Sequence, residues 1–313
     1  MEQKRIYAIG ESAYDILFKN GKPYDGKVGG AIVNSAVSLG RMQCEVYLIG
    51  DIADDEIGKI SLNFLQENKI KTEYFRLNPY NQSRISLAFI DNPNQPHYLF
   101  YKLKGENIFQ LTFPEYNSGD YILFGSLYSI RPDHHSQIFE FLQKAQAHNS
   151  LIYYDPNFRK NHSNILPSLL PNILKNIEIS DIIKGSDEDF DTIFGCKNFE
   201  ETIHKIDSSN KKILIYTRGK KSLKASVYGK FLELKIDEVE TVSAVGAGDS
   251  FNAGFVWELY DRNICKENIK NIHLEIWSQI LQSANRFAAH VCTRDENYIS
   301  TDFADDINLK FRE

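Results

Sequence analysis

Short apolar runs rich in β-branched and aromatic residues alternate along this chain with longer segments of helical periodicity. Six of the short runs have the pattern of buried strands, at 5–10, 45–50, 121–125, 151–155, 181–185 and 212–217. Between them lie segments whose apolar residues recur every three or four positions, at 54–69, 132–148 and 165–177. Strands that alternate with helices form βαβ units. The chain is therefore predicted to adopt an α/β fold, with a parallel sheet covered by helices on both faces.

One region departs from this alternation. Residues 71–104 contain several short strand-like runs separated by Asn and Pro, with no helix-length segment between them. Together with residues 12–27 they predict a small antiparallel β-sheet. Because α/β proteins bind ligands at the carboxyl edge of the main sheet, we expect this insertion to form a lid over that edge. No linker interrupts the chain, so residues 1–313 are expected to form a single α/β domain.

Charge and composition limit the partners that this chain can bind. With 36 basic and 42 acidic residues its formal charge is −6, which leaves no global positive field for nucleic acid or an anionic membrane. No apolar stretch is long enough to span a bilayer, and Glu11 and Asp15 interrupt the first apolar run, so no signal peptide is expected. The four cysteines lack zinc or disulfide spacing. We expect a reduced, cytoplasmic protein that acts on a small molecule.

The segment with the most chemical information is 243–255, SAVGAGDSFNAGF, where a turn of small residues leads directly into a helical pattern. The first N–H groups of a helix lack internal partners, so the amides of Ala247, Gly248 and Asp249 could bind a phosphoryl group. Asp249 would place a carboxylate beside that anion, where a substrate hydroxyl gives up its proton. The alternative is structural: Gly246 and Gly248 form a tight turn and Asp249 caps a helix.

A second glycine pair precedes a helical pattern in the segment 27–40. Gly29 and Gly30 would let a polyhydroxylated ligand approach the backbone, and Asn34 offers both a donor and an acceptor one turn later. Asp15, just after the first strand, could accept hydrogen bonds from hydroxyls at the same edge. Taken singly, each of these residues is more often structural, as a turn glycine, a helix-surface Asn or a loop Asp.

In combination, these segments resemble the ribokinase-like (PfkB) family of carbohydrate kinases, and especially its fructokinase-like members. Residues 29–59 resemble the amino-terminal signature of the family, and residues 244–255 its carboxy-terminal signature. Residues 153–159, YYDPNFR, are similar to the DPNxR stretch of fructokinase-like and ketodeoxygluconate-kinase-like members, and residues 283–294 to the helix that closes the adenine pocket. The resemblance implies a three-layer α/β fold with a small β lid, and ATP-dependent phosphorylation of a sugar.

The resemblance also implies roles for individual residues. Asp249 would be the catalytic base, and the anion hole would consist of Gly246, Ala247 and Gly248. The residues implied to hold the sugar are Asp15, Gly29, Gly30, Asn34, Tyr101, Asn157 and Arg159. Those implied to bind the nucleotide are Lys184, Ser186, Thr217, Arg218, Gly219 and Asn285. Asp189 would contribute to magnesium binding through water.

The chain departs from the family pattern at two motifs that concern cations. Ser243 and Ala244 stand where members often carry Asp-Thr, so a carboxylate associated with a bound monovalent cation is missing and potassium activation is doubtful. The Asn-x-x-Glu motif, linked to magnesium, aligns with residues 186–189, where Asp189 keeps a carboxylate but Ser186 lacks the amide. Magnesium is therefore expected to bind mainly through the ATP phosphates and water.

An exposed lid sheet with aromatic side chains favours association, so a homodimer through the lid is expected; the aromatic residues are Phe89, Tyr98, Phe100 and Tyr101.

Fructose leads among the sugars, with ketodeoxygluconate next because Arg84 or Arg159 could pair with its carboxylate. A nucleoside kinase of the same family remains an alternative, as does a catalytically retired sugar- or nucleotide-binding regulator. The DPNFR stretch favours a sugar, and an intact Asp249 favours an enzyme.

Overall fold

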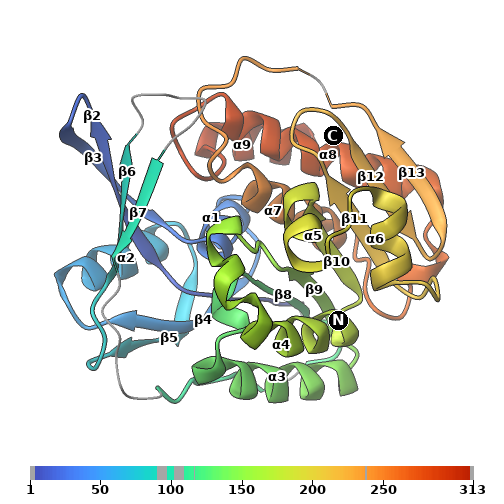
Figure 1. Ribbon diagram of the computed structural model, residues 1–313, viewed down its shortest axis with the longest axis horizontal. Coiled ribbons are helices and arrows are strands. Elements are labelled where there is room, and N and C mark those ends of the chain that lie inside the picture. The colour runs from blue at the N-terminus through green and yellow to red at the C-terminus, as the bar shows by residue number, and fades with distance from the viewer. Residues whose placement is uncertain (1–3, 90–96, 102–108, 116, 237, 311–313) are drawn as a thin grey trace.

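A nine-stranded sheet forms the centre of the larger body of the protein in this computed structural model, which describes residues 4–89, 97–101, 109–115, 117–236 and 238–310 (Figure 1). The strand order is β13-β12-β11-β10-β9-β8-β1-β4-β5. Its parallel strands are β1 (Ile6–Ile9), β4 (Val46–Ala53), β5 (Lys71–Asn78), β8 (Tyr121–Gly125), β9 (Leu151–Asp155), β10 (Ile182–Ser186) and β11 (Ile213–Thr217). Two antiparallel strands extend one edge, β12 (Leu223–Val227) and β13 (Lys230–Leu234). All six predicted strands are therefore confirmed.

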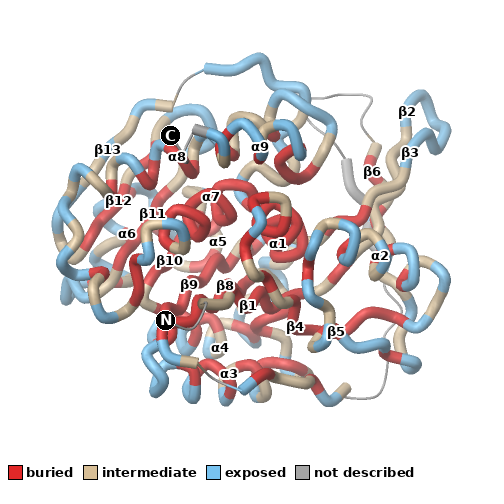
Figure 2. Tube along the Cα trace, turned by 180° about the vertical axis from the view of Figure 1, so that it is seen from behind, coloured by how far each residue is buried: buried red, intermediate tan, exposed pale blue. Residues whose placement is uncertain are grey.

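Helices cover both faces of this sheet, which makes the body a three-layer structure. One face carries α1 (Ala31–Arg41), α2 (Glu56–Glu67), α7 (Ala247–Asp261), α8 (Leu274–Cys292) and α9 (Thr301–Lys310). The other carries α3 (Pro132–Ala147), α4 (Leu166–Ile179), α5 (Asp187–Phe194) and α6 (Phe199–Ile206). Along β1, Ile6 and Ala8 pack into the first core while Tyr7 and Ile9 pack into the second. Burial on both faces explains why the strands are continuously apolar (Figure 2).

The predicted lid exists as a separate four-stranded sheet beside this body (Figure 1). In the order β3-β2-β6-β7, its strands are β2 (Ala13–Lys19), β3 (Lys22–Gly29), β6 (Arg84–Phe89) and β7 (His97–Tyr101). The two outer pairs are antiparallel, as predicted, whereas the central pair of β2 and β6 is parallel.

The predicted boundary of the second lid segment, 71–104, was wrong at its start. Residues 71–78 form β5, which pairs in parallel with β4 at the edge of the main sheet. Helix α2 connects β4 to β5, so this strand completes a βαβ unit rather than opening a hairpin of the lid. Residues 102–104 lie outside the described residues, and the lid segments seen are 13–29, 84–89 and 97–101.

An ion-pair network joins the lid to the body. Glu11 follows β1, and one of its carboxylate oxygens, Oε2, lies 2.9 Å from Arg84 Nη2 and 3.2 Å from Arg131 Nη1. Arg84 is the first residue of β6 in the lid, whereas Arg131 precedes α3 in the body. The Glu11 carboxylate therefore connects the lid to the body through two guanidinium groups that are both largely buried.

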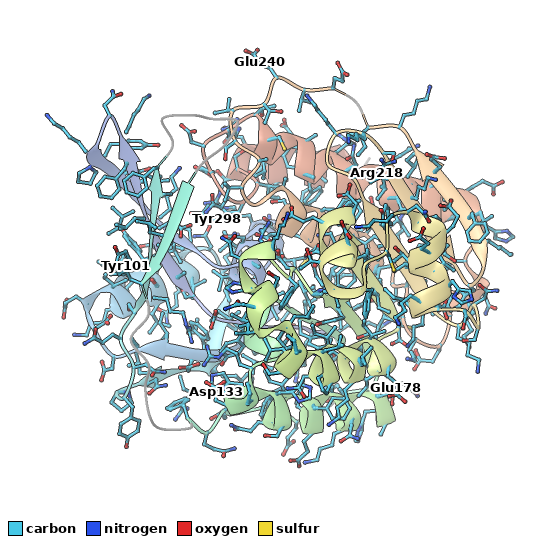
Figure 3. The ribbon with its side chains drawn as sticks, viewed as in Figure 1. Tyr101, Asp133, Glu178, Arg218, Glu240 and Tyr298 are labelled. Carbon is cyan, nitrogen blue, oxygen red and sulfur yellow. The ribbon has the colours of Figure 1, made fainter. Side chains whose placement is uncertain are left out.

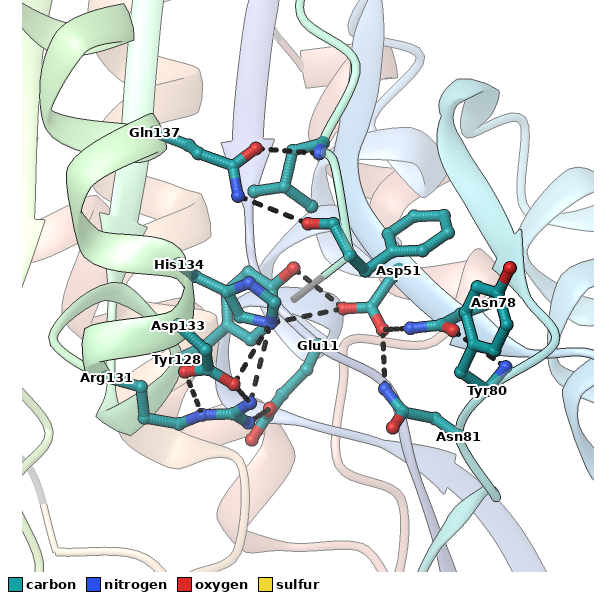
Figure 4. A network of polar contacts seen from close by, with 12 residues as sticks. Glu11, Asp51, Asn78, Tyr80, Asn81, Tyr128, Arg131, Asp133, His134 and Gln137 are labelled. Atoms are coloured by element: carbon teal, nitrogen blue, oxygen red, sulfur yellow. Dashed lines mark hydrogen bonds and ion pairs between the residues drawn. The ribbon is translucent and has the colours of Figure 1, made fainter. Parts of the chain in front are cut away.

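A second carboxylate, Asp51 near the end of β4, is buried next to this network (Figure 4). It accepts hydrogen bonds from Asn78 Nδ2 at 2.7 Å, Asn81 Nδ2 at 3.2 Å and the Tyr128 hydroxyl at 2.9 Å. Burial alone would raise the pKa of Asp51, but the Asn78 hydrogen bond and the charge of Arg84 hold it below its ordinary value. Asn78 ends β5 and Asn81 lies between β5 and the lid strand β6, so Asp51 holds the segment that leads from the main sheet to the lid.

No helix in the described part of the chain is both long and apolar enough to cross a membrane.

Candidate active site

Helix α7 begins at the small-residue turn that the sequence singles out. Gly246, its N-cap, has a left-handed φ of 78°, and a Cβ atom at this position would come within 2.0 Å of the Asn297 carbonyl oxygen. Only glycine fits such a conformation so close to another backbone segment. The turn therefore fixes where the first amides of α7 point.

Two of those amides are open. The amide of Ala247, predicted to be part of the anion hole, donates to the Ala244 carbonyl at 3.3 Å. The amides of Gly248 and Asp249 have no acceptor within the described ranges, and no side chain caps the helix. Unpaired N–H groups at the positive end of a helix can bind anions, so these two amides are open to an anion.

Asp249 carries one of these two open amides and is 6% exposed. Its Oδ2 accepts a hydrogen bond from Asn34 Nδ2 at 2.8 Å, and its backbone carbonyl accepts one from Ser35 Oγ at 2.8 Å. Burial raises the pKa of Asp249 to about 6, although the Asn34 hydrogen bond and the charges of Arg159 and Lys184 oppose the rise. The carboxylate is thus a stronger base than an exposed Asp, and still ionised at neutral pH.

Asn34 comes from α1, whose start depends on the predicted glycine pair. Gly30 is the N-cap of α1 with φ 119°, and a Cβ there would lie 2.3 Å from the Glu11 carbonyl oxygen. The Oδ1 atom of Asn34 is buried and has no hydrogen-bond partner in the part of the chain that the structure describes. Because a buried acceptor without a partner is costly, this atom is available for a ligand hydroxyl.

Asp15 lies on the lid side of the same region. Its Oδ2 would be 2.7 Å from a Cβ at Gly29, so the glycine leaves room for the carboxylate. The Asp15 carboxylate accepts a hydrogen bond from Ser86 Oγ at 2.5 Å on Oδ1 and one from Asn297 Nδ2 at 3.3 Å on Oδ2. Burial raises the pKa of Asp15 above its ordinary value even though these bonds oppose it. The predicted sugar residues of the amino-terminal half therefore gather between lid and α1.

The DPN segment after β9 forms a tight turn. Asn157 adopts a left-handed φ of 39°, and its amide donates to Asp155 Oδ1 at 3.1 Å. The turn leads to Arg159, an exposed residue whose charge lowers the pKa of Asp249. Asp155 itself is 1% exposed, and its Oδ2 accepts 2.8 Å hydrogen bonds from Lys184 Nζ and Asn252 Nδ2.

Four of the predicted nucleotide residues lie at or just after the ends of strands β10 and β11. Ser186 and Thr217 are paired in register at the ends of β10 and β11. Arg218 and Gly219 follow in an exposed turn, and Asn285 is a half-buried residue of α8. Tyr101, predicted for the sugar, ends the outer lid strand β7 and is 58% exposed, so it is not part of the buried group around Asp249 (Figure 3).

Asp189, the predicted magnesium residue, is engaged in a capping box at the start of α5. Its Oδ2 accepts hydrogen bonds from Ser186 N at 2.7 Å and Ser186 Oγ at 2.6 Å. Burial and the nearby Asp155 raise the pKa of Asp189. Among the described residues, no group of three or more His, Cys, Asp or Glu side chains could hold a metal ion. A water-mediated role of Asp189 stays a prediction.

Three site residues were missed by sequence reasoning: Asp155, Asn252 and Asn297. Asp155 lies within the DPNFR motif and Asn252 within GAGDSFN. Their place in these two motifs is the only sequence feature that could have marked them as site residues. Asn297 bonds to Asp15 and packs its backbone against Gly246. No pattern in the sequence marks it, because its partners are far away along the chain.

Anion binding and proton removal at adjoining atoms are what the transfer of a phosphoryl group to a hydroxyl requires, so the fold and site define a phosphotransferase with an alcohol acceptor. Sequence comparison specifies the class further. The sequence profile of the pfkB family carbohydrate kinases matches residues 6–302, and the chain belongs to this family. The predicted resemblance is thereby confirmed, and the protein is a sugar kinase.

Individual relatives agree with this assignment. The chain is 28% identical over 268 residues to a fructokinase of Rhizobium leguminosarum bv. trifolii, covering 83% of this chain and 81% of that protein. Among solved structures, the Vibrio cholerae O395 fructokinase in its fructose, ADP and calcium ion bound form superposes with a TM-score of 0.83 at 17% identity, over 94% of both chains. Aminoimidazole riboside kinase from Salmonella enterica gives 0.80 at 18% identity, over 98% of this chain and 99% of that one. These structures confirm the ribokinase-like fold.

Proposed function

We propose that this chain transfers the γ-phosphoryl group of ATP to a hydroxyl of fructose. The observation that carries the proposal is the 2.8 Å hydrogen bond between Asn34 and Asp249. This bond connects Asn34, which is predicted to hold the sugar, to the carboxylate of Asp249, whose pKa is raised. Asp249 lies in the first turn of α7, next to the open amides proposed as the anion hole. The fructokinase relative supports fructose as the acceptor.

The mechanism follows from the positions of these groups. The acceptor hydroxyl would lie beside Asp249, oriented by Asn34 Oδ1. A carboxylate with a pKa of about 6 cannot deprotonate an alcohol in advance, so the proton moves to Asp249 late, as the oxygen–phosphorus bond forms. The amides of Gly248 and Asp249 bind the charge that spreads over the phosphoryl oxygens, and the leaving ADP keeps the electron pair of the broken bond.

ATP and Mg²⁺ are proposed as co-substrate and metal. The open amides at α7 fit a phosphate group, whereas the described carboxylates form no metal cluster. Mg²⁺ would be held by the phosphates and water, and would supply charge neutralisation during transfer. Ser243, at the position where members often carry a carboxylate, accepts a hydrogen bond from the Val245 amide at 3.2 Å. Its hydroxyl serves the turn, and we expect turnover without added potassium.

Release of ADP from Mg-ATP across a panel of acceptors tests this function. The panel comprises fructose, ribose, ketodeoxygluconate, adenosine and aminoimidazole riboside, each with and without potassium. The highest turnover is expected with fructose. Turnover confined to the two nucleosides would establish a nucleoside kinase instead. Silence across the panel, with ATP binding retained in calorimetry, would overturn the proposal in favour of a ligand-binding regulator.

The pH dependence of kcat/KM should report the ionisation of Asp249. The base must be ionised to accept a proton and its pKa is raised to about 6, so kcat/KM is expected to fall as pH drops below that value. Arg159→Gln removes a positive charge that lowers this pKa, and should move the profile to higher pH. A profile that stays flat between about pH 5 and about pH 8 would contradict the role of Asp249.

We also propose that the lid pairs two copies of the chain, and that the enzyme is cytoplasmic. Tyr24 on β3 and Leu99 and Tyr101 on β7 are apolar or aromatic side chains with 46%, 39% and 58% of their surface exposed. Side chains of this kind on edge strands favour association. Tyr98 and Phe100 have side chains outside those described. Sedimentation at micromolar concentration is expected to show a dimer, and a monomer would contradict the pairing.

The four free cysteines support a reducing compartment.

A further inference from the structure

A surface cavity of about 290 Å³ lies at the edge of the main sheet, where β11 begins. Its lining comes from Lys211 just before β11, from the turn between β12 and β13, and from Ile272 and Leu274 where α8 begins. Thr217, a predicted nucleotide residue, is at the other end of β11, so the length of that strand separates it from the cavity. In Figure 1 the β12–β13 hairpin is at the right and the lid at the left.

The lining of this cavity is strongly positive. It includes three lysines, Lys211, Lys230 and Lys270, and no acidic residue among those that the structure describes. All three lysines are exposed, and none forms an ion pair within the described ranges. The chain as a whole carries a formal charge of −6, so this cavity concentrates positive charge against the overall balance. Such a site attracts anions.

Two carboxylates lie near the cavity, but both are already engaged. Asp207 is 3% exposed, and its two oxygens accept hydrogen bonds from the backbone amides of Lys211 and Lys212, each at 2.9 Å. Asp181 forms an ion pair with Lys266. Neither carboxylate pairs with a lysine ammonium of the lining, so those ammonium groups remain for a ligand.

Tyr228 is the aromatic residue of the lining, and its backbone is strained. With Gly229 it forms the two-residue turn between β12 and β13, and its φ is 49°. Turns of this kind favour Asn, Asp or Gly, because a left-handed conformation is costly for a bulky side chain. The ammonium of Lys270 lies over the Tyr228 ring, 5.9 Å from its centroid. An aromatic ring is therefore kept beside a cation at a position where the turn itself favours a small residue.

We propose that this cavity binds a small phosphate monoester whose organic part is planar or apolar. A phosphate group concentrates up to two negative charges and suits a cluster of ammonium groups. Lys211, Lys230 and Lys270 bind the phosphate, and the organic part packs against Tyr228 and the apolar side chains at the start of α8. The volume of the cavity, about 290 Å³, suits a ligand of this size. This site is separate from the one around Asp249 and does not rest on the proposed function.

Calorimetric titration with phenyl phosphate, without ATP or sugar, tests the proposal. In the cavity variant, Lys211→Gln, Lys230→Gln and Lys270→Gln are combined, and it is expected to fold because all three side chains are exposed. Its affinity for phenyl phosphate should be about tenfold or more below that of the wild type, since three charge contacts are lost. Phosphate bound at the start of α7 would be common to both proteins, so their difference reports the cavity.

A second triple variant provides the matched control. Lys69→Gln, Lys205→Gln and Lys235→Gln remove the same charge from exposed lysines that do not line the cavity. This control is expected to bind phenyl phosphate as the wild type does. An equal loss in both triple variants would show a general effect of net charge and would overturn the proposal.

Tyr228→Asn tests the part of the ring. Asn is favoured in the left-handed conformation of the turn, so the hairpin is expected to form. The affinity for phenyl phosphate should fall while that for inorganic phosphate stays unchanged, because only the organic part contacts the ring. Unchanged affinity for both would contradict the packing against Tyr228.

These titrations measure binding alone, so their outcome is independent of whether fructose is phosphorylated. With fructose and Mg-ATP, the cavity variant is expected to keep the kcat of the wild type, since the cavity is remote from Asp249. Equal affinity for phenyl phosphate in the wild type and the cavity variant would overturn the proposal. So would the absence of binding to the wild type at millimolar concentration.

Discussion

Asp249→Asn is expected to fold and to bind ATP and sugar, but to turn over about a thousandfold or more slowly than the wild type. The variant keeps the shape of the side chain, and its amide can donate to Asn34 Oδ1, which is otherwise unpaired within the described residues. It cannot accept the proton of the hydroxyl. The quantity to measure is kcat, and the affinities for ATP and fructose are measured separately by calorimetry.

The same variant should also be more stable than the wild type at neutral pH. Folding raises the pKa of Asp249 from 3.8 to about 6, so its ionised form costs free energy in the folded state. The gain of the variant should appear as pH rises above about 4, level off above about 6, and reach on the order of 3 kcal/mol. Near-wild-type turnover of Asp249→Asn would contradict the role of Asp249 in the mechanism. A variant less stable than the wild type at neutral pH would contradict the free-energy cost of burying the ionised carboxylate.

Gly246→Ala is expected to cost about 2–5 kcal/mol of the free energy of unfolding. The left-handed φ of 78° is unfavourable for Ala, and the new Cβ would collide with the Asn297 carbonyl oxygen at 2.0 Å. Neither the new Cβ nor the Asn297 carbonyl oxygen can rotate away, because both positions are set by the backbone. The turn at Gly246 or the loop around Asn297 must therefore move. Turnover should fall as well, since the anion hole follows directly in the chain.

Gly248→Ala is the matched control for this change. Gly248 lies inside α7 with an ordinary helical conformation, and the nearest atom to a new Cβ is the side-chain nitrogen of Lys184, at 3.1 Å, rather than a backbone atom. Its loss of stability should be much smaller than that of Gly246→Ala. Unfolding in urea can be followed by the fluorescence of the buried Trp257 and Trp277. Equal losses for the two variants would contradict the account of the turn.

The sequence predicted the central strands well because each is apolar on both faces. Strand β5 was misassigned to the lid for a physical reason: it lies at the edge of the sheet and several of its residues are exposed, so its pattern resembles that of the lid strands. Sequence reasoning also left β12 and β13, the antiparallel strands at the other edge, without assignment as strands. The edge strands β5 and β13 carry a weaker apolar signal, and in β12, which pairs on both sides, Lys224 and Ser226 interrupt the apolar residues.

For the site, motifs predicted which residues matter, but not how they meet. Asn34 and Asp249 are 215 positions apart and share a hydrogen bond that no spacing rule reveals. The same holds for Asp155 and Lys184, whose contact depends on two neighbouring parallel strands. Local turn chemistry can be read from glycines and small residues, whereas contacts between distant segments depend on how the helices pack across the sheet.

Formation of a sugar phosphate from Mg-ATP and fructose tests the central claim most directly. We would incubate the purified protein with both and identify the products by phosphorus NMR, with Asp249→Asn alongside. A phosphate ester of fructose is expected in amounts equal to ADP, formed by the wild type and almost absent with the variant. ADP with free phosphate and no sugar ester, or equal ester formation by both proteins, would contradict it.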